Sequence, residues 1–225
     1  MKRALVYIGL LALFGAIAAQ ASPIDCASLT TLNQLIAANA GGGCYSQDKI
    51  FSNFDYSGAG SLTNPASTVR LTLVFQPGPG NQDVRGWSFN PTTAWGASFT
   101  LAYDVTVCTS VAQGCVQPSI GGAINGSLDQ MNTGRTPNGT VMTDTQSVGN
   151  MTLFGTSVLN ETAQLNFSPV LSVHTSSTST FSGGSLMSSY EQDFFETSLP
   201  EPATYFMLAG GLMLLGLASK RFKKA

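Results

Sequence analysis

Two segments in which apolar and polar residues alternate restrict the fold of this chain more than any other feature. In residues 99–107 every second residue is apolar, and in residues 69–75 apolar residues alternate in the same way with Arg70 and Thr72. A period of two predicts strands that bury one face. We therefore expect six side chains to be buried: Leu71, Leu73, Phe75, Leu101, Tyr103 and Val105.

Further short segments resemble strands and are separated by Gly, Pro and Asn residues. These segments are 51–56, 87–89, 120–128, 148–154, 163–167, 171–174 and 186–195. About eight to ten short strands without helices between them are typical of a sandwich or a jelly roll. The sequence thus predicts an all-β fold, an antiparallel β-sandwich or jelly-roll-like domain.

One short helix is expected near the start of this domain. Leu29, Leu32, Leu35 and Ile36 are spaced three to four residues apart. Ser28 is a candidate N-cap, and three glycines at 41–43 would end the helix.

The N-terminus has the pattern of a secretion signal. Two basic residues precede an uncharged, mostly apolar run of 15 residues, 4–18, and small residues at Ala19 and Ala21 suit a cleavage site after Ala21. The alternative is an uncleaved anchor, but a membrane-spanning helix needs about 20 residues. We expect residues 1–21 to be a signal peptide, which implies an exported protein in an oxidising compartment.

Four cysteines permit three pairings. Pairing neighbours along the chain gives Cys26–Cys44 and Cys108–Cys115, and the second bridge would close a hairpin. The alternative, a zinc site made by all four, is disfavoured because such sites use CxxC pairs, which are absent.

Charge and histidine content exclude several functions. Between Ser22 and Leu199 there are four basic and eleven acidic side chains, a net charge of about −7, which argues against nucleic-acid binding. His174 is the only histidine, so sites built on two imidazoles are excluded. We expect no metal and no cofactor.

The C-terminus combines three features in a fixed order. A Pro200-Glu201-Pro202 motif precedes an uncharged apolar segment, 203–218, and a basic tail made of Lys220, Arg221, Lys223 and Lys224. A helix of 16 residues spans about 24 Å, less than the roughly 30 Å of a bilayer core. We expect a marginal transmembrane helix whose basic tail stays in the cytoplasm. The alternatives are a plain anchor and a core helix.

These three features resemble the PEP-CTERM sorting signal of Gram-negative bacteria that make exopolysaccharide. The resemblance implies that exosortase, a membrane enzyme of cysteine transpeptidase type, acts near the Pro-Glu-Pro motif. It implies an inner-membrane precursor that is then sorted to the outer surface or the extracellular matrix. Cys44 and residues 48–56 also resemble one group of PEP-CTERM proteins, without implying an activity. The expected domains are therefore 1–21, 22–199 and 200–225.

No catalytic constellation emerges from the sequence. His174 lies at the end of a strand-like run and no GxSxG elbow occurs, so a serine triad is not supported. Glu161, Glu191, Asp193 and Glu196 could supply a glycosidase acid and nucleophile, but any chain with eleven carboxylates offers such pairs. We expect no enzyme and no catalytic residue.

Two classes of function remain open. The first is a non-enzymatic surface or matrix protein that is associated with extracellular polysaccharide, on which Trp87, Trp95 or Tyr103 could stack if exposed. The alternative is a secreted glycan-active enzyme or carbohydrate-binding module on a jelly-roll fold.

Overall fold

The computed structural model describes residues 22–58, 64–77, 82–116, 122–132, 139–155 and 161–197. The expected signal peptide and the expected sorting signal both lie outside these residues. Within the described residues, no helix is long and apolar enough to cross a membrane.

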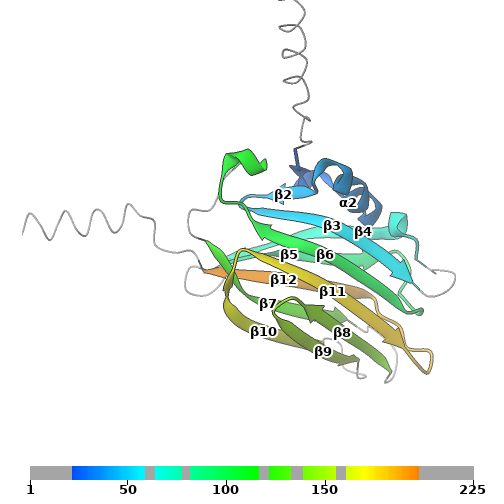
Figure 1. Ribbon diagram of the computed structural model, residues 1–225. Coiled ribbons are helices and arrows are strands. Elements are labelled where there is room, and N and C mark those ends of the chain that lie inside the picture. Colours follow the sequence, from blue (N-terminus) through cyan, green and yellow to red (C-terminus); the bar gives the residue numbers. More distant parts are fainter. Residues whose placement is uncertain are drawn as a thin grey trace, which may run out of the picture.

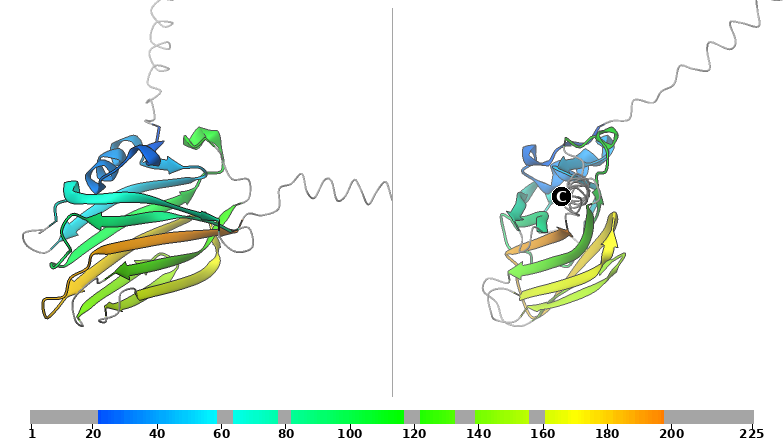
Figure 2. Two further views of the ribbon diagram at one scale, coloured as in Figure 1. Left: turned by 180° about the vertical axis from the view of Figure 1, so that it is seen from behind. Right: turned by 90° about the vertical axis from the view of Figure 1, so that its left-hand side faces the viewer.

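Two β-sheets pack face to face, which confirms the expected sandwich (Figure 1). The larger sheet contains, in spatial order, β1 (Ile24–Asp25), β2 (Cys44–Ser46), β3 (Lys49–Gly58), β6 (Phe99–Val107), β11 (Ser172–Phe181), β8 (Thr140–Gln146) and β9 (Gly149–Gly155). The smaller sheet contains β10 (Glu161–Val170), β7 (Ala123–Asn132), β12 (Ser189–Thr197), β5 (Gln82–Pro91) and β4 (Val69–Pro77). The end-on view in Figure 2 shows the two layers.

The strands from β5 to β12 pair as a nested set. β8 pairs with β9, β7 with β10, β6 with β11, and β5 with β12, and all four ladders are antiparallel. Successive pairs alternate between the sheets, which is the strand order of a jelly roll. The sandwich thus contains eight nested strands, and β3 and β4 extend the two sheets.

Each open flank of the sandwich is covered. Helix α2 (Leu32–Ala38) packs against β3 of one sheet and β4 of the other, where it buries Leu32 and Leu35. At the opposite flank β9 lies against β10 (Figure 1). Both lateral flanks of the core are therefore covered by secondary structure.

The expected helix is present, but its expected start is wrong. Thr31 is the N-cap, and the side chain of Gln34 accepts hydrogen bonds from the backbone N–H groups of Thr30 and Thr31. Ser28 instead ends a 3₁₀ turn, Cys26–Ser28, that precedes the helix. At the other end Gly42 has φ 86°, as the predicted glycine terminator requires.

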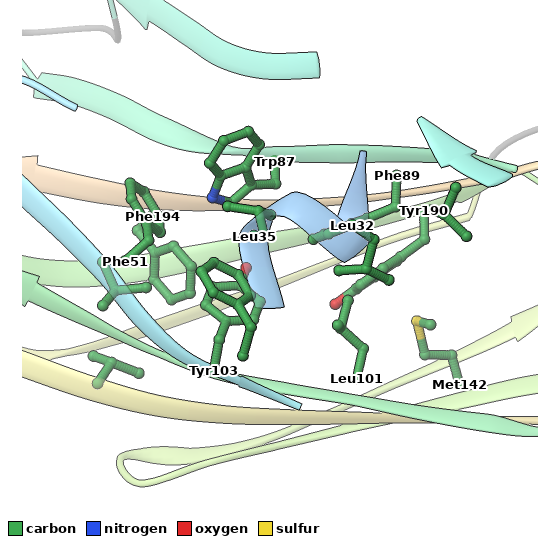
Figure 3. Close-up of a cluster of buried hydrophobic side chains, with 14 of the residues drawn as sticks. Leu32, Leu35, Phe51, Trp87, Phe89, Leu101, Tyr103, Met142, Tyr190 and Phe194 are labelled. Carbon is green, nitrogen blue, oxygen red and sulfur yellow. The ribbon is translucent and has the colours of Figure 1, made fainter. Parts of the chain in front are cut away.

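Aromatic side chains from both sheets fill the core (Figure 3). Phe51 meets Trp87 edge-on, Phe89 stacks on Tyr190, and Phe194 lies edge-on to Tyr103. Of the side chains expected to be buried, Leu101, Tyr103 and Val105 are buried, and Leu71 and Leu73 are half-buried against the core. The sixth, Phe75, is 57% exposed and the expectation for it is wrong.

Both expected disulfides are present, Cys26–Cys44 and Cys108–Cys115. We expected the second bridge to close a hairpin, but this expectation is wrong, because β6 and β7 belong to different sheets. It closes instead a loop that contains the 3₁₀ turn Val111–Gln113.

Candidate functional site

The outer face of the five-stranded sheet carries a row of polar side chains. Thr72 on β4, Ser88 on β5 and Glu191 on β12 are aligned by the strand register, and Gln130 on β7 continues the row. These side chains point outward because their neighbours along each strand face the core, as the buried Trp87 does. The row thus presents hydroxyl, carboxyl and amide groups on one surface.

Two hollows follow one another along β4 and β5 on this face. The first, of about 420 Å³, is lined by Thr72, Leu73, Val74, Phe75, Ser88, Asn90 and Glu191. The second, of about 390 Å³, is lined by Thr30, Thr31, Ser67, Thr68, Arg70 and Thr92. Arg70 and Thr72 are two residues apart on β4 and therefore lie on the same face, so the two hollows adjoin. We call them the Phe75 hollow and the Arg70 hollow.

The ring of Phe75 packs on the residue opposite it in the strand register. Phe75 pairs with Arg85 on β5, and the Arg85 guanidinium carbon lies 3.5 Å from the centre of the Phe75 ring. Arg85 is 1% exposed, and its Nη2 donates to Oε1 of Gln47. A cation on the ring face holds an aromatic side chain in place. The alternation along β4 puts this ring on the side of Leu73, which faces the core, so Phe75 marks the edge of the hollow and does not join the polar row on the outer face.

The polar wall of the same hollow is also ordered. Nδ2 of Asn90 donates to Oγ of Ser88 over 3.1 Å, which orients both groups. Asn90 and Ser88 share the outer face of β5 with Gly86.

A pair of carboxyl groups lies beside this hollow. Glu191 and Asp193 occupy the same face of β12, and Asp193 lies opposite Gly86, where any β-carbon would overlap its carboxyl oxygen. Burial raises the pKa of Asp193 to about 8, and the neighbouring charge of Glu191 contributes to this shift. Asp193 is therefore protonated at neutral pH.

The other carboxyl groups singled out from the sequence are not brought to this pair. Glu196 points into the sandwich and forms a buried ion pair with Lys49. Glu161 is on β10, two strands away from β12.

The aromatic residues proposed from the sequence to stack on sugars are all buried. Trp87, Trp95 and Tyr103 are 0%, 2% and 0% exposed, so they belong to the core. Phe75 was expected to be buried because its alternation matches that of a core residue, and its side chain does lie on the core side of β4. The signal that could have indicated its exposure is its place near the end of a strand, just before the Pro- and Gly-rich residues 77–80.

His174 lies on the outer face of the other sheet and is exposed, as expected for a surface strand residue. Its Nδ1 lies 2.6 Å from Oδ1 of Asp104, and Nδ2 of Asn53 donates to the other oxygen of that carboxylate. In the described part of the chain, His, Cys, Asp and Glu side chains nowhere gather in a group of three that could hold a metal ion.

A second polar cluster lies inside the sandwich, where no glycan could reach it. Asp144 accepts four hydrogen bonds of 2.7 to 2.9 Å, from Gln146, Thr175, Ser177 and Gln192. Asp129, from the opposite sheet, accepts from Gln192 as well. Both aspartates are fully buried. This cluster is a part of the core and not a binding site.

No protein-family model matches the sequence, and no curated protein matches it. Among solved structures, "CBM35 from Cellvibrio japonicus Abf62" has 13% sequence identity, covers 62% of this chain and 92% of its own, and gives a TM-score of 0.24. "Xyl-CBM35 in complex with glucuronic acid containing disaccharide" has 17% identity, covers 62% of this chain and 84% of its own, and gives a TM-score of 0.25. Similarity at this level gives no information about a site in this chain.

Proposed function

We propose that this protein binds carbohydrate along the outer face of β4, β5 and β12 and has no enzymatic activity. The observation that carries the proposal is the pair of adjoining hollows on this face, which present hydroxyl, amide and guanidinium groups, some of them ordered by hydrogen bonds. These polar groups can exchange hydrogen bonds with the sugar hydroxyls.

The dimensions of the two hollows favour an extended ligand. They border β4 from Arg70 to Phe75, and a strand rises about 3.3 Å per residue, so along this strand they span on the order of 17 Å. A short segment of a polysaccharide chain could occupy such a length. Most of the residues that line the two hollows are polar, which suits a sugar polymer better than a small apolar ligand.

We further propose that the protein is exported and sorted by exosortase, with Pro200, Glu201 and Pro202 as the sorting motif and the membrane as a transient or lasting anchor. The two disulfides support an extracytoplasmic location, because such bonds persist in oxidising compartments. Binding of extracellular polysaccharide would give a sorted surface protein a role in the matrix.

A glycan-active enzyme is the second candidate, and the Glu191–Asp193 pair is the observation that favours it. A protonated carboxyl beside a second carboxyl is what a retaining glycosidase requires. Asp193 is only 3% exposed, however, and a general acid has to reach the glycosidic oxygen. This burial favours binding over hydrolysis.

Binding of the purified full chain to a panel of polysaccharides, with product analysis, tests the proposal. Asn90→Ala should weaken the binding at least about tenfold, whereas Asn150→Ala should not. Asn150 is a matched control because it is an exposed asparagine on the outer face of the other sheet. Equal loss in both variants, or no binding at all, would contradict the proposed function. Release of shortened glycans that stops in Asp193→Asn would establish the enzyme instead.

A further inference from the structure

We infer that the Arg70 hollow binds the carboxylate of an acidic sugar, so that the ligand of this face is a glycan that contains uronic acid or an equivalent carboxylate. This inference rests on the proposed function, because it assigns the ligand class of the same face. It starts from the charges of the described residues.

Arg70 is the one basic side chain in the described part of the chain that is available to a ligand. Lys49 is buried between Asp48 and Glu196, and Arg85 is buried beneath Phe75. Arg70 is exposed, and no hydrogen bond or ion pair joins its guanidinium to another described residue. In a domain with an excess of acidic groups, an exposed arginine without an acidic partner marks a place where an anion is favoured.

The lining of the Arg70 hollow suits a sugar better than a simple anion. Each of the other five residues that line it carries a hydroxyl group, and none carries a carboxylate. Two of these hydroxyls have fixed orientations, because Thr30 donates to Gln34 and Thr68 donates to the carbonyl of Pro65. Their oxygen lone pairs remain available to accept from sugar hydroxyls. Arg70 can meanwhile hold a carboxylate through two parallel hydrogen bonds.

The position of Arg70 on the strand explains why its guanidinium lies in this hollow. Its side chain points to the same outer face as Thr72, two residues further along β4. The backbone of Thr31 pairs with that of Arg70, which brings the segment before α2 against the edge of β4. This pairing places two of the lining hydroxyls beside the guanidinium.

The Phe75 hollow carries an acidic side chain and the Arg70 hollow a basic one, so the ligand can bind in only one orientation along the face. Glu191 borders the Phe75 hollow, so a sugar carboxylate is disfavoured there. A neutral sugar would occupy the Phe75 hollow, and an acidic sugar would follow at Arg70. The face therefore distinguishes a glycan with spaced carboxylates from a neutral one.

Calorimetric titration of the full chain with tetragalacturonate and with the same oligosaccharide after reduction of its carboxyl groups tests the inference. The wild type should bind the acidic form at least about tenfold more tightly, as expected for a charge-assisted pair of hydrogen bonds. Arg70→Gln should remove this difference and leave binding of the reduced form within about twofold. Arg70→Lys should retain a part of the difference, because it keeps the charge without the fork. Thr152→Ala, on the outer face of the other sheet, is the matched control.

Other results would overturn the inference in distinguishable ways. Equal binding of both oligosaccharides, unchanged in Arg70→Gln, refutes the carboxylate site and leaves the proposed function standing. Failure to bind either form, together with no effect of Asn90→Ala on binding to the polysaccharide panel, refutes the proposed function itself. Arg70-dependent binding of oligoglutamate without any binding of the sugars would assign the site to an acidic peptide.

Discussion

Asp129 on β7 and Asp144 on β8 belong to opposite sheets, yet the same amide nitrogen of Gln192 donates to both, over 3.1 Å and 2.7 Å. Burial, and then the charge of Asp144, raise the pKa of Asp129 well above its usual range. Burial therefore favours the protonated form of Asp129, and Asp144 is the member of the pair that is surrounded by donors. This polar cluster links the two sheets.

Substitution of the two aspartates should have unequal effects on stability. Asp144→Asn places an N–H₂ group against donors that now bond to a carboxylate, and we expect a loss of about 3 kcal/mol or more in the free energy of unfolding. Asp129→Asn replaces a group whose neutral form is favoured by burial and that accepts fewer hydrogen bonds, so it should cost less than half as much. Urea denaturation of the full chain at neutral pH measures both. Equal losses would contradict the difference between the two carboxyl groups.

Asp193 should make stability decrease as pH rises. Its pKa of about 8 in the fold lies above the ordinary value of an aspartate, about 3.9, so the folded state binds the extra proton between these values. The stability that this proton contributes is complete below about pH 4 and lost by about pH 8. Asp193→Asn should therefore stabilise the protein by at least about 1 kcal/mol at pH 8 relative to wild type, and not at pH 4. Thermal melts at the two pH values decide this, and a gain of equal size at both would rule out the titration.

The buried Lys49–Glu196 ion pair should show strong coupling. Glu196→Ala leaves the ammonium of Lys49 inside the sandwich with Asp48 as its remaining carboxylate, and we expect a loss of about 3–5 kcal/mol. The double variant Lys49→Ala with Glu196→Ala should lose less than the sum of the losses in the two corresponding single variants. A double-mutant cycle in denaturant provides the measurement. Additive losses would mean that the two groups do not interact.

The Cys26–Cys44 disulfide should matter more than the other one. It closes the segment that contains α2, and both of its cysteines belong to the main core. Replacement of both by Ala should cost about 2–4 kcal/mol and should increase hydrogen exchange in α2. The same replacement of Cys108 and Cys115, which lie in a small separate cluster, serves as the control and should leave exchange in α2 unchanged. Equal hydrogen exchange in α2 in both variants would show that the Cys26–Cys44 disulfide does not hold the helix in place.

The sorting proposal makes its own prediction. Glu201→Gln or Pro202→Ala should leave membrane insertion intact, because neither changes the apolar segment 203–218, but should block processing. A pulse-chase in a host with its exosortase should then show the precursor persisting in the inner membrane. Normal maturation of both variants would mean that the C-terminal segment is a plain anchor and not a sorting signal.

The predicted sandwich, helix and disulfides follow from signals that the sequence carries locally: alternation, helical spacing and cysteine proximity. The strand β8 was not predicted, because three of its four inward side chains are polar: Thr140, Asp144 and Gln146. β11 extends to Phe181, well past the predicted end at His174, for the same reason, since Thr175, Ser177 and Ser179 face the core. A polar interior removes the hydrophobic contrast on which such predictions depend.

The candidate face was harder to predict than the fold. Glu191 and Asp193 could be placed on one side of a strand from their spacing alone. Their relation to Phe75 and Arg70 depends on which strands become neighbours, and β12 reaches β5 from a distant part of the chain. No pattern within a single segment contains that information.

The nested pairing has a consequence for how the chain must assemble. β12 is the last strand in the sequence but the middle strand of its sheet, and its partners in β5 lie more than 100 residues earlier. Until residues 189–197 have been synthesised and exported, the edges of β5 and β7 that pair with β12 have no partner strand. Long-range closure of this kind is slow, and the waiting edges are prone to aggregate. We therefore expect premature folding to be suppressed until the C-terminal part arrives, and chains truncated before β12 to be degraded instead of secreted.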